Sequence, residues 1–203
     1  GILAFAQELS RLGVEIVSTG GTAKALREGQ VPIKDISEVT GFPEMLDGRL
    51  KTIHPRIAGG ILAMRANTEH MQALLEHSIA PIDMVVVNLY AFDKVAAKPG
   101  VQVSELIENI DIGGPTMIRA AAKNYQDVAV VVSPEDYNSI IEQLRAGGGE
   151  LPAAVHWQLA VKAFTLTAQY DSAISARLSG IALNGSVFED HKTAIPDFLR
   201  IHA

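Results

Sequence analysis

The sequence predicts an α/β fold, a three-layer sandwich in which helices cover both faces of a central parallel sheet. Short apolar runs at residues 84–87 and 128–132 alternate along the chain with segments of helical periodicity. Each run is apolar throughout, which is typical of a strand buried on both faces of a parallel sheet. Because such sheets bind ligands at the carboxyl ends of their strands, the loops that begin at Ser18, Asn88 and Asp111 are candidate site loops.

The helices of this fold are predicted where apolar residues recur every three or four positions. The first runs from the chain start to Gly13, and the others cover residues 23–28, 68–79, 101–109, 115–123, 134–145 and 153–179. A strand is predicted over residues 14–18, followed by a tight turn over residues 19–22. Residues 37–60 have no sustained period and are predicted to form a long functional loop. The tail after Gly180 shows no clear period.

The composition excludes several kinds of chemistry. The 203 residues contain no cysteine, which rules out disulfides, a thiol nucleophile and thiolate-held zinc. The six histidines form no close ligand pair, so no protein-held metal is expected. A net charge of −6 disfavours nucleic-acid binding by a diffuse basic face. No apolar run approaches the roughly 20 residues of a membrane helix, and the lack of cysteine fits a reducing compartment such as the cytoplasm.

The first candidate site motif is Ser-Thr-Gly-Gly-Thr-Ala-Lys at residues 18–24, between a strand and a helix. Gly20 and Gly21 let the backbone approach an anion closely, and a helix N-terminus offers unpaired N–H groups. The hydroxyls of Thr19 and Thr22 add two donors. The motif indicates a phosphate-binding loop, and taken alone it is equally compatible with an ordinary strand-to-helix turn.

A second motif is the basic segment Arg-Leu-Lys-Thr at residues 49–52. If the backbone is extended, Arg49 and Lys51 point the same way. Together with Thr52 they suit a phosphate or a polarised carbonyl oxygen. The alternative is a solvated basic loop, which two charges in isolation favour. The adjacent His54 is equally compatible with a backbone-bonding role and a catalytic one.

Two further pairs of residues carry candidate chemistry. Asn88 and Tyr90 follow the most apolar strand, where an amide can recognise a base edge and a hydroxyl can donate a proton. A strand-end tyrosine with its ring in the core is the alternative. Asp111 precedes a Gly-Gly pair, and Lys123 ends the next helix. An acid and a lysine brought together share a proton, whereas alone Lys123 complements the helix dipole. The residues thus predict a cofactor-free anionic-ligand site.

Five collinear motifs resemble the IMP cyclohydrolase domain of the PurH family of bifunctional purine-biosynthesis enzymes. They lie at residues 18–24, 38–55, 88–92, 110–124 and 162–171. The resemblance implies a methylglyoxal synthase-like fold. It also implies ring closure of 5-formamido-imidazole-carboxamide ribotide (FAICAR) to IMP with loss of water, a step that needs no cofactor or metal.

The same resemblance assigns roles to individual residues. The implied catalytic set is Lys51, Tyr90, Asp111 and Lys123. The implied purine-ribotide contacts are Thr19, Gly20, Gly21, Thr22, Arg49, Leu50, Thr52, Val87, Asn88, Ile112, Gly113 and Gly114. The family usually has Tyr-Pro-Phe where this chain has Tyr-Ala-Phe at residues 90–92, and losing the proline is expected to loosen that loop.

The resemblance also implies a domain organisation. Residues 1–180 would form the cyclohydrolase domain, without the family's first strand and part of its phosphate turn. Residues 181–203 would form a linker towards an AICAR formyltransferase domain that is absent here and uses 10-formyltetrahydrofolate. A cytoplasmic homodimer is expected, with no nucleic-acid or membrane partner.

Two alternative functions share the phosphate loop. One is a methylglyoxal synthase-type lyase acting on a triose phosphate, which has no use for the Arg-x-Lys-Thr and Asn-Leu-Tyr segments. The other is a non-catalytic nucleotide-sensing regulatory domain, which does not need the whole catalytic set. Turnover of FAICAR discriminates among the three.

Overall fold

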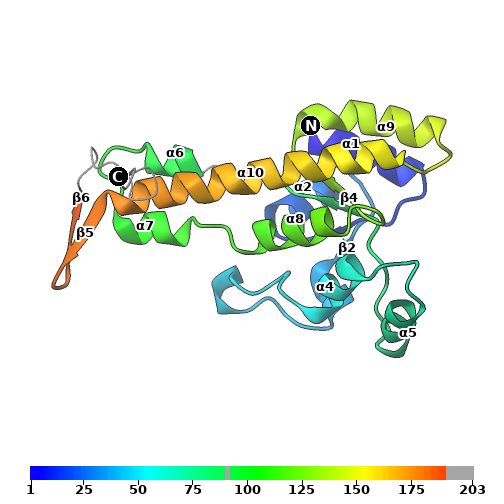
Figure 1. Ribbon diagram of the computed structural model, residues 1–203, viewed down its shortest axis with the longest axis horizontal. Coiled ribbons are helices and arrows are strands. Elements are labelled where there is room, and N and C mark those ends of the chain that lie inside the picture. The colour runs from blue at the N-terminus through cyan, green and yellow to red at the C-terminus, as the bar shows by residue number, and fades with distance from the viewer. Residues whose placement is uncertain (90–91, 191–203) are drawn as a thin grey trace, which may run out of the picture. The chain divides into compact units, whose positions relative to one another are not determined.

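The computed structural model describes residues 1–89 and 92–190 (Figure 1). These residues form two compact units. The first contains residues 1–88 and 113–164, and the second contains the described residues among 89–112 together with residues 165–190. The long helix α10 (Ala153–Ser179) begins in the first unit and ends in the second.

The strands of the first unit pair in parallel. Strand β1 (Val17–Ser18) pairs with β2 (Lys34–Asp35), and β3 (Met84–Val86) pairs with β4 (Ala129–Val131). Strand β4 is buried along its whole length, as an apolar run covered on both faces should be. The predicted α/β class is therefore confirmed. Among the described residues the parallel strands form two separate pairs rather than one continuous sheet.

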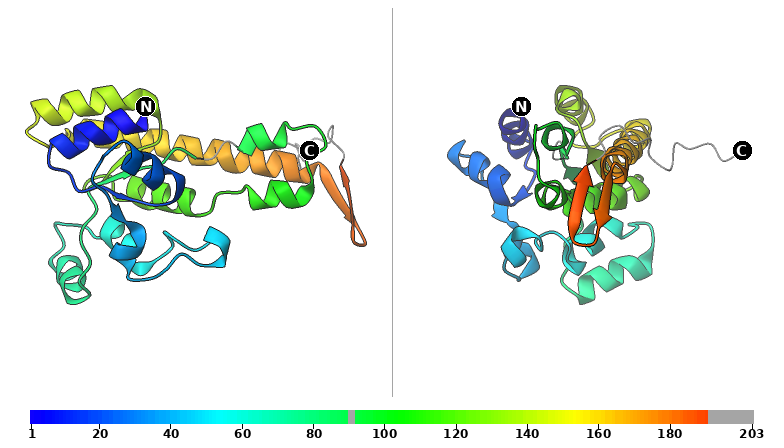
Figure 2. Two further views of the ribbon diagram at one scale, coloured as in Figure 1. Left: turned by 180° about the vertical axis from the view of Figure 1, so that it is seen from behind. Right: turned by 90° about the vertical axis from the view of Figure 1, so that its left-hand side faces the viewer.

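Most of the helices belong to the first unit. They are α1 (Ile2–Arg11), α2 (Gly20–Glu28), α3 (Ile36–Thr40), α4 (Pro55–Leu62), α5 (Thr68–Glu76), α8 (Gly113–Lys123) and α9 (Tyr137–Ala146), with 3₁₀ turns η1 (Leu46–Gly48) and η2 (Pro134–Asp136). Helices α1 and α9 lie side by side in both views (Figures 1 and 2), where Phe5 stacks on Tyr137 with ring centroids 4.2 Å apart. None of the helices in the described part of the chain is both long and apolar enough to cross a bilayer.

A buried amide connects two helices that carry site residues. The side-chain Nδ2 of Asn124, just after α8, donates to the carbonyl oxygens of Ile61 and Ala63 at 2.9 and 3.0 Å. These carbonyls lie at the C-terminal end of α4, where helix carbonyls lack an intrahelical partner. Asn124 therefore fixes the end of α4 against the end of α8.

The prediction of an irregular loop over residues 37–60 was wrong at both ends, where α3 and α4 lie. Helix α3 begins with a capping box, because the Asp35 carboxylate accepts from Ser37 N and the Glu38 carboxylate accepts from Asp35 N. These helices have five and eight residues, too few for a periodic signal. The predicted turn over residues 19–22 is likewise the N-cap and first turn of α2, and α8 begins two residues before the predicted start.

The capping box makes the first unit sensitive to acid. Hydrogen bonds from Ser37 and the Arg27 guanidinium hold the pKa of Asp35 below its ordinary value of 3.8. A carboxylate whose pKa is lower in the folded protein than in the unfolded chain stabilises the fold fully at a pH above its unfolded pKa. This stabilisation is lost as the pH falls through the pKa of the folded protein. We therefore expect wild type to exceed Asp35→Asn in unfolding free energy by about 1 kcal/mol or less at pH 7, because the pair is exposed. Urea unfolding at pH 7 and pH 3 measures the loss of this difference, and a pH-independent difference contradicts the prediction.

The second unit has its own small core. It contains α6 (Phe92–Ala96), α7 (Val103–Glu108) and the end of α10, and its buried side chains are Phe92, Val95, Leu106 and Tyr170. Strands β5 (Ile181–Asn184) and β6 (Val187–Asp190) follow α10 as an antiparallel hairpin (Figure 2). This hairpin was not predicted, although its two-residue Gly185-Ser186 turn is a hairpin signal and Gly185 has φ +65°.

Candidate active site

The glycine-rich motif forms the start of a helix, as a phosphate loop would. Thr19 is the N-cap of α2 and has an extended backbone, and Gly20 follows with φ +59°, a conformation that favours glycine. A Cβ added at Gly21 would have no heavy atom within 4 Å, and Gly20, Gly21 and Thr22 are all exposed. The first turn of α2 is therefore exposed, and helix N-termini of this kind can bind an anion through their backbone N–H groups.

Lys51 is held beside this turn by a tight hairpin. Met45 and Leu50 exchange two backbone hydrogen bonds of 3.1 and 3.2 Å, so the residues outside them face each other. The Nζ atom of Lys51 accordingly lies 3.1 Å from the Glu44 carboxylate. Gly48, which turns the chain inside this hairpin, has φ +87°, a conformation that favours glycine.

Two contacts join motifs that are far apart in the sequence. The position of a Cβ at Gly20 is 3.8 Å from Nζ of Lys51. The position of a Cβ at Gly113, the first residue of α8, is only 2.6 Å from Oγ1 of Thr52. The basic segment, residues 49–52, therefore lies against the glycine loop, residues 18–24, through Lys51. Through Thr52 it lies against the Gly-Gly motif, residues 113–114. Three of the motifs that carried the family resemblance meet at this point.

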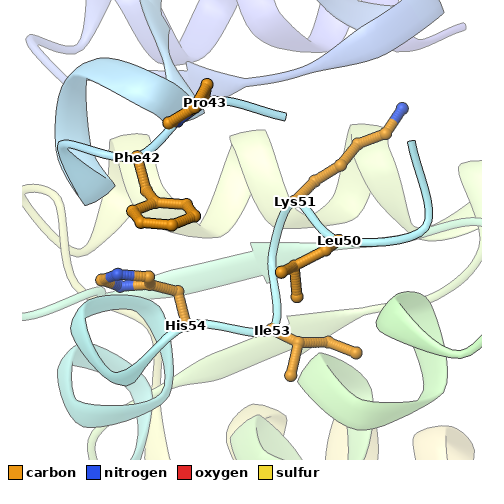
Figure 3. A pocket seen from close by; sticks show the side chains of 6 residues that line it. All are labelled: Phe42, Pro43, Leu50, Lys51, Ile53 and His54. Carbon is orange, nitrogen blue, oxygen red and sulfur yellow. The ribbon is translucent and has the colours of Figure 1, made fainter. Parts of the chain in front are cut away.

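A cavity of about 210 Å³ opens beside Lys51 (Figure 3). Its lining residues are Phe42, Pro43, Leu50, Lys51, Ile53 and His54. The rings of Phe42 and His54 face each other on one side with centroids 6.3 Å apart, and Leu50 and Ile53 lie opposite. Lys51 extends away from the two rings. The cavity thus combines apolar walls with a cation at its rim, which suits a planar heterocycle joined to an anionic group.

His54 has the backbone-bonding role that the sequence left open. It is the N-cap of α4, and its Nδ1 accepts a 3.1 Å hydrogen bond from Arg56 N, with Pro55 at the first helical position. In the neutral ring the proton is therefore on Nε2, so His54 offers the cavity a donor rather than a base. Phe42, the other ring on this side of the cavity, is fixed by its N–H donating to Thr40 Oγ1 at 3.1 Å.

Two substitutions separate the cap from the cavity wall. His54→Ala is expected to lower the unfolding free energy by about 1 kcal/mol, whereas His54→Asn, a good N-cap, should leave it nearly unchanged. Both remove the ring, so both should weaken binding of a ribonucleotide such as IMP. Thermal unfolding and IMP titration measure the two effects. Equal destabilisation by the two variants would contradict the capping role.

The predicted base-contact residue Asn88 is oriented by a tyrosine that the sequence analysis did not select. Its Nδ2 donates to the hydroxyl of Tyr137 at 3.0 Å, and Tyr137 is buried under Phe5. The preceding residue, Val87, is fixed at the end of β3 by donating its N–H to the Val131 carbonyl at 3.0 Å. This end of the parallel pair therefore presents a fixed amide, as the strand-end rule predicts.

Asp111 and Ile112 belong to the second unit. The backbone N–H of Asp111 donates to the hydroxyl of Tyr170 at 2.8 Å. Burial raises the pKa of the Tyr170 hydroxyl above its ordinary value, and the nearby Asp111 carboxylate raises it further. Asp111 is half-buried, whereas Ile112 is exposed.

The remaining predicted residues are not brought together by a described contact. Tyr90 lies outside the described residues. Arg49 is exposed and has helical backbone angles, so the extended conformation expected across residues 49–51 is absent at this position. Lys123 is the exposed last residue of α8, about 15 Å along the helix axis from Gly113. Gly114 is buried in the first turn of the same helix. The shared proton of Asp111 and Lys123 stays a prediction.

No group of three or more acidic or histidine side chains in residues 1–89 and 92–190 is arranged to hold a metal ion.

Comparison with known proteins places the chain in a family. The chain belongs to the MGS-like domain family, whose model matches residues 1–116. Residues 121–198 match the model of the AICARFT/IMPCHase bienzyme. The resemblance inferred from the five motifs is thereby confirmed.

Two relatives show how far the similarity extends. Over 185 residues the chain is 54% identical to the bifunctional purine biosynthesis protein PurH of Magnetococcus marinus (strain ATCC BAA-1437 / JCM 17883 / MC-1). The aligned residues make up 91% of this chain and 35% of that protein. The chain therefore spans about a third of that relative's length. A solved structure titled "Crystal structure of ForH" superposes with a TM-score of 0.78 at 34% identity, covering 85% of this chain and 88% of that one.

Proposed function

We propose that this chain is an IMP cyclohydrolase, which closes the second ring of FAICAR to give IMP and water. The observation that carries the proposal is the meeting of Lys51 with the glycine loop and of Thr52 with Gly113, beside an apolar cavity. The 54% identity with a PurH protein supports the same chemistry.

The proposed binding mode follows from the charges. The ribotide phosphate lies at the exposed N-terminus of α2, where Thr19 to Thr22 offer backbone N–H groups and hydroxyls. The heterocycle lies against the apolar cavity, and the amide of Asn88 recognises its edge. Lys51 stands next to the glycine loop at the cavity rim, and its ammonium turns from its partly exposed pair with Glu44 to the charge that develops on the reacting group.

The reaction is an addition followed by elimination of water. The carboxamide nitrogen attacks the formyl carbon and gives up one proton as the new C–N bond forms. The formamido nitrogen gives up a second proton as the C=N bond forms, and the former formyl oxygen leaves as water with both protons. Holding both groups of one molecule in contact supplies much of the rate.

Four residues have proposed roles in these steps. Lys51 and the Tyr90 hydroxyl donate to the formyl oxygen as negative charge grows on it. Asp111 and Lys123 take the proton from the carboxamide nitrogen, a poor nucleophile, and return it to the leaving oxygen. The step needs no cofactor or metal.

Incubation of the purified chain with FAICAR tests the proposal, with the absorbance change of IMP formation as the signal. IMP formation supports it. Methylglyoxal from dihydroxyacetone phosphate would instead identify a lyase, and nucleotide binding without either turnover would identify a sensing domain. Either of those results overturns the proposed function.

The proposal for the whole protein is broader. As the family resemblance implies, a second domain would transfer a formyl group from 10-formyltetrahydrofolate to AICAR and so supply FAICAR to this one. A homodimer in the cytoplasm, and the division into residues 1–180 and a linker at 181–203, complete this proposal.

A further inference from the structure

Tyr170 has a second role besides filling the core of the second unit. Its ring is buried among Phe92 and Leu106, with an edge-to-face contact of 6.4 Å between the Phe92 and Tyr170 centroids. Its hydroxyl, at the other end of the ring, accepts the backbone N–H of Asp111 at 2.8 Å. One side chain of α10 therefore contacts the two segments of this unit that carry implied catalytic residues, since Phe92 follows Tyr90 by two positions.

The position of this hydrogen bond gives it a specific consequence. Asp111 lies between helix α7, which ends at Glu108, and α8, which begins at Gly113. In such a connecting segment the backbone N–H has no helix partner, so a side-chain acceptor decides where the residue lies. The acceptor belongs to a ring packed in a core, and a packed ring has little freedom to move. The hydroxyl thus fixes the backbone from which the Asp111 carboxylate projects.

Resting on the proposed cyclohydrolase function, we propose that Tyr170 is a positioning residue, whose hydroxyl holds Asp111 at the distance from which its carboxylate serves the carboxamide nitrogen. The Tyr170 hydroxyl does not touch the substrate in this role. Burial favours its neutral form, so it keeps its proton while it accepts the Asp111 N–H.

Tyr170→Phe is the direct test, because it keeps the ring in the core and removes only the acceptor. We expect kcat for FAICAR cyclisation to fall roughly ten- to a hundredfold with KM changed less than about twofold, since misplacement acts on the reacting geometry. Tyr125→Phe is the matched control. Its ring also packs edge-to-face on an aromatic side chain, Trp157, and its substitution should leave kcat unchanged.

A double-mutant cycle separates positioning from a general loss of stability. If Tyr170 acts through Asp111, adding Tyr170→Phe to Asp111→Ala should change kcat less than about twofold, because no carboxylate remains to be positioned. If the two effects multiply instead, or if Tyr170→Phe has wild-type kcat, the proposal is overturned.

A measurement independent of activity keeps this test distinct from that of the proposed function. Hydrogen exchange of the Asp111 amide, followed by NMR, should be at least about tenfold faster in Tyr170→Phe than in wild type, while core amides of β4 exchange as before. An unchanged hydrogen-exchange rate of the Asp111 amide overturns the proposal that the Tyr170 hydroxyl holds Asp111, even if the chain turns over another substrate. If wild type does not turn over FAICAR, both the cyclohydrolase function and the catalytic role of the Asp111–Tyr170 hydrogen bond are overturned, whatever the exchange rate.

Discussion

Replacing Lys51 by Met should lower kcat for FAICAR cyclisation by about two to three orders of magnitude, the usual loss when one donor to a developing oxyanion is removed. Met keeps the length and apolar stem of the side chain and removes the charge. Stability should change by less than about 1 kcal/mol, because both partners of the Lys51–Glu44 pair are partly exposed. Steady-state kinetics and thermal unfolding measure the two quantities.

Lys24→Met is the matched control for this loss. Lys24 also belongs to the glycine-loop segment, but its side chain is 79% exposed and its partner, Glu28, is 4.0 Å away on the same helix. The Lys24→Met variant should therefore keep wild-type kcat. A Lys51→Met chain as active as Lys24→Met would remove Lys51 from the mechanism, and a Lys51→Arg chain with partial activity would show that the charge itself is needed.

The helix start beside Gly20 and Gly21 could be predicted because it depends on local rules. Two glycines just before a helical pattern indicate a turn at which an anion can bind, and α2 begins there, at Gly20 rather than at the predicted residue 23. The strands β3 and β4 and the helix α10 were predictable for the same reason, since each has a long or uniformly apolar pattern.

The partners of the site residues could not be predicted, because they come from distant parts of the chain. The Tyr137 hydroxyl is 49 positions from Asn88, and the Tyr170 hydroxyl is 59 positions from Asp111. No spacing rule connects such pairs. Tyr170 does lie in one of the five family motifs, which is the one signal that could have selected it.

The hairpin that holds Lys51 escaped prediction for a different reason. It turns through three consecutive residues with positive φ, at +55° for Leu46, +53° for Asp47 and +87° for Gly48. A leucine rarely adopts this conformation, so local propensity argues against the turn that forms. Such strain persists where surrounding structure enforces it, and it concentrates at functional sites. Here it brings Glu44 and Lys51 face to face.

Gly113→Ala should lower the unfolding free energy by about 1–3 kcal/mol, because the new methyl group would lie 2.6 Å from Oγ1 of Thr52. Thr52 is β-branched and rotates with difficulty, so the backbone must move instead. That movement separates the basic segment from α8, and affinity for IMP should fall with stability. Urea unfolding and IMP titration measure both effects.

A second substitution identifies the clash as the cause. Adding Thr52→Ala removes Oγ1, so the double variant should be no less stable than Thr52→Ala alone, whereas adding Thr52→Ser keeps the oxygen but frees its rotation and should restore only part of the stability. Gly21→Ala gives the opposite pattern. Its Cβ meets no atom within 4 Å, and an alanine in a helix is about 1 kcal/mol better than a glycine, so stability should rise. IMP affinity should nevertheless fall, because the methyl group fills the space proposed for the phosphate. Loss of stability without loss of affinity in Gly21→Ala would place the anion elsewhere.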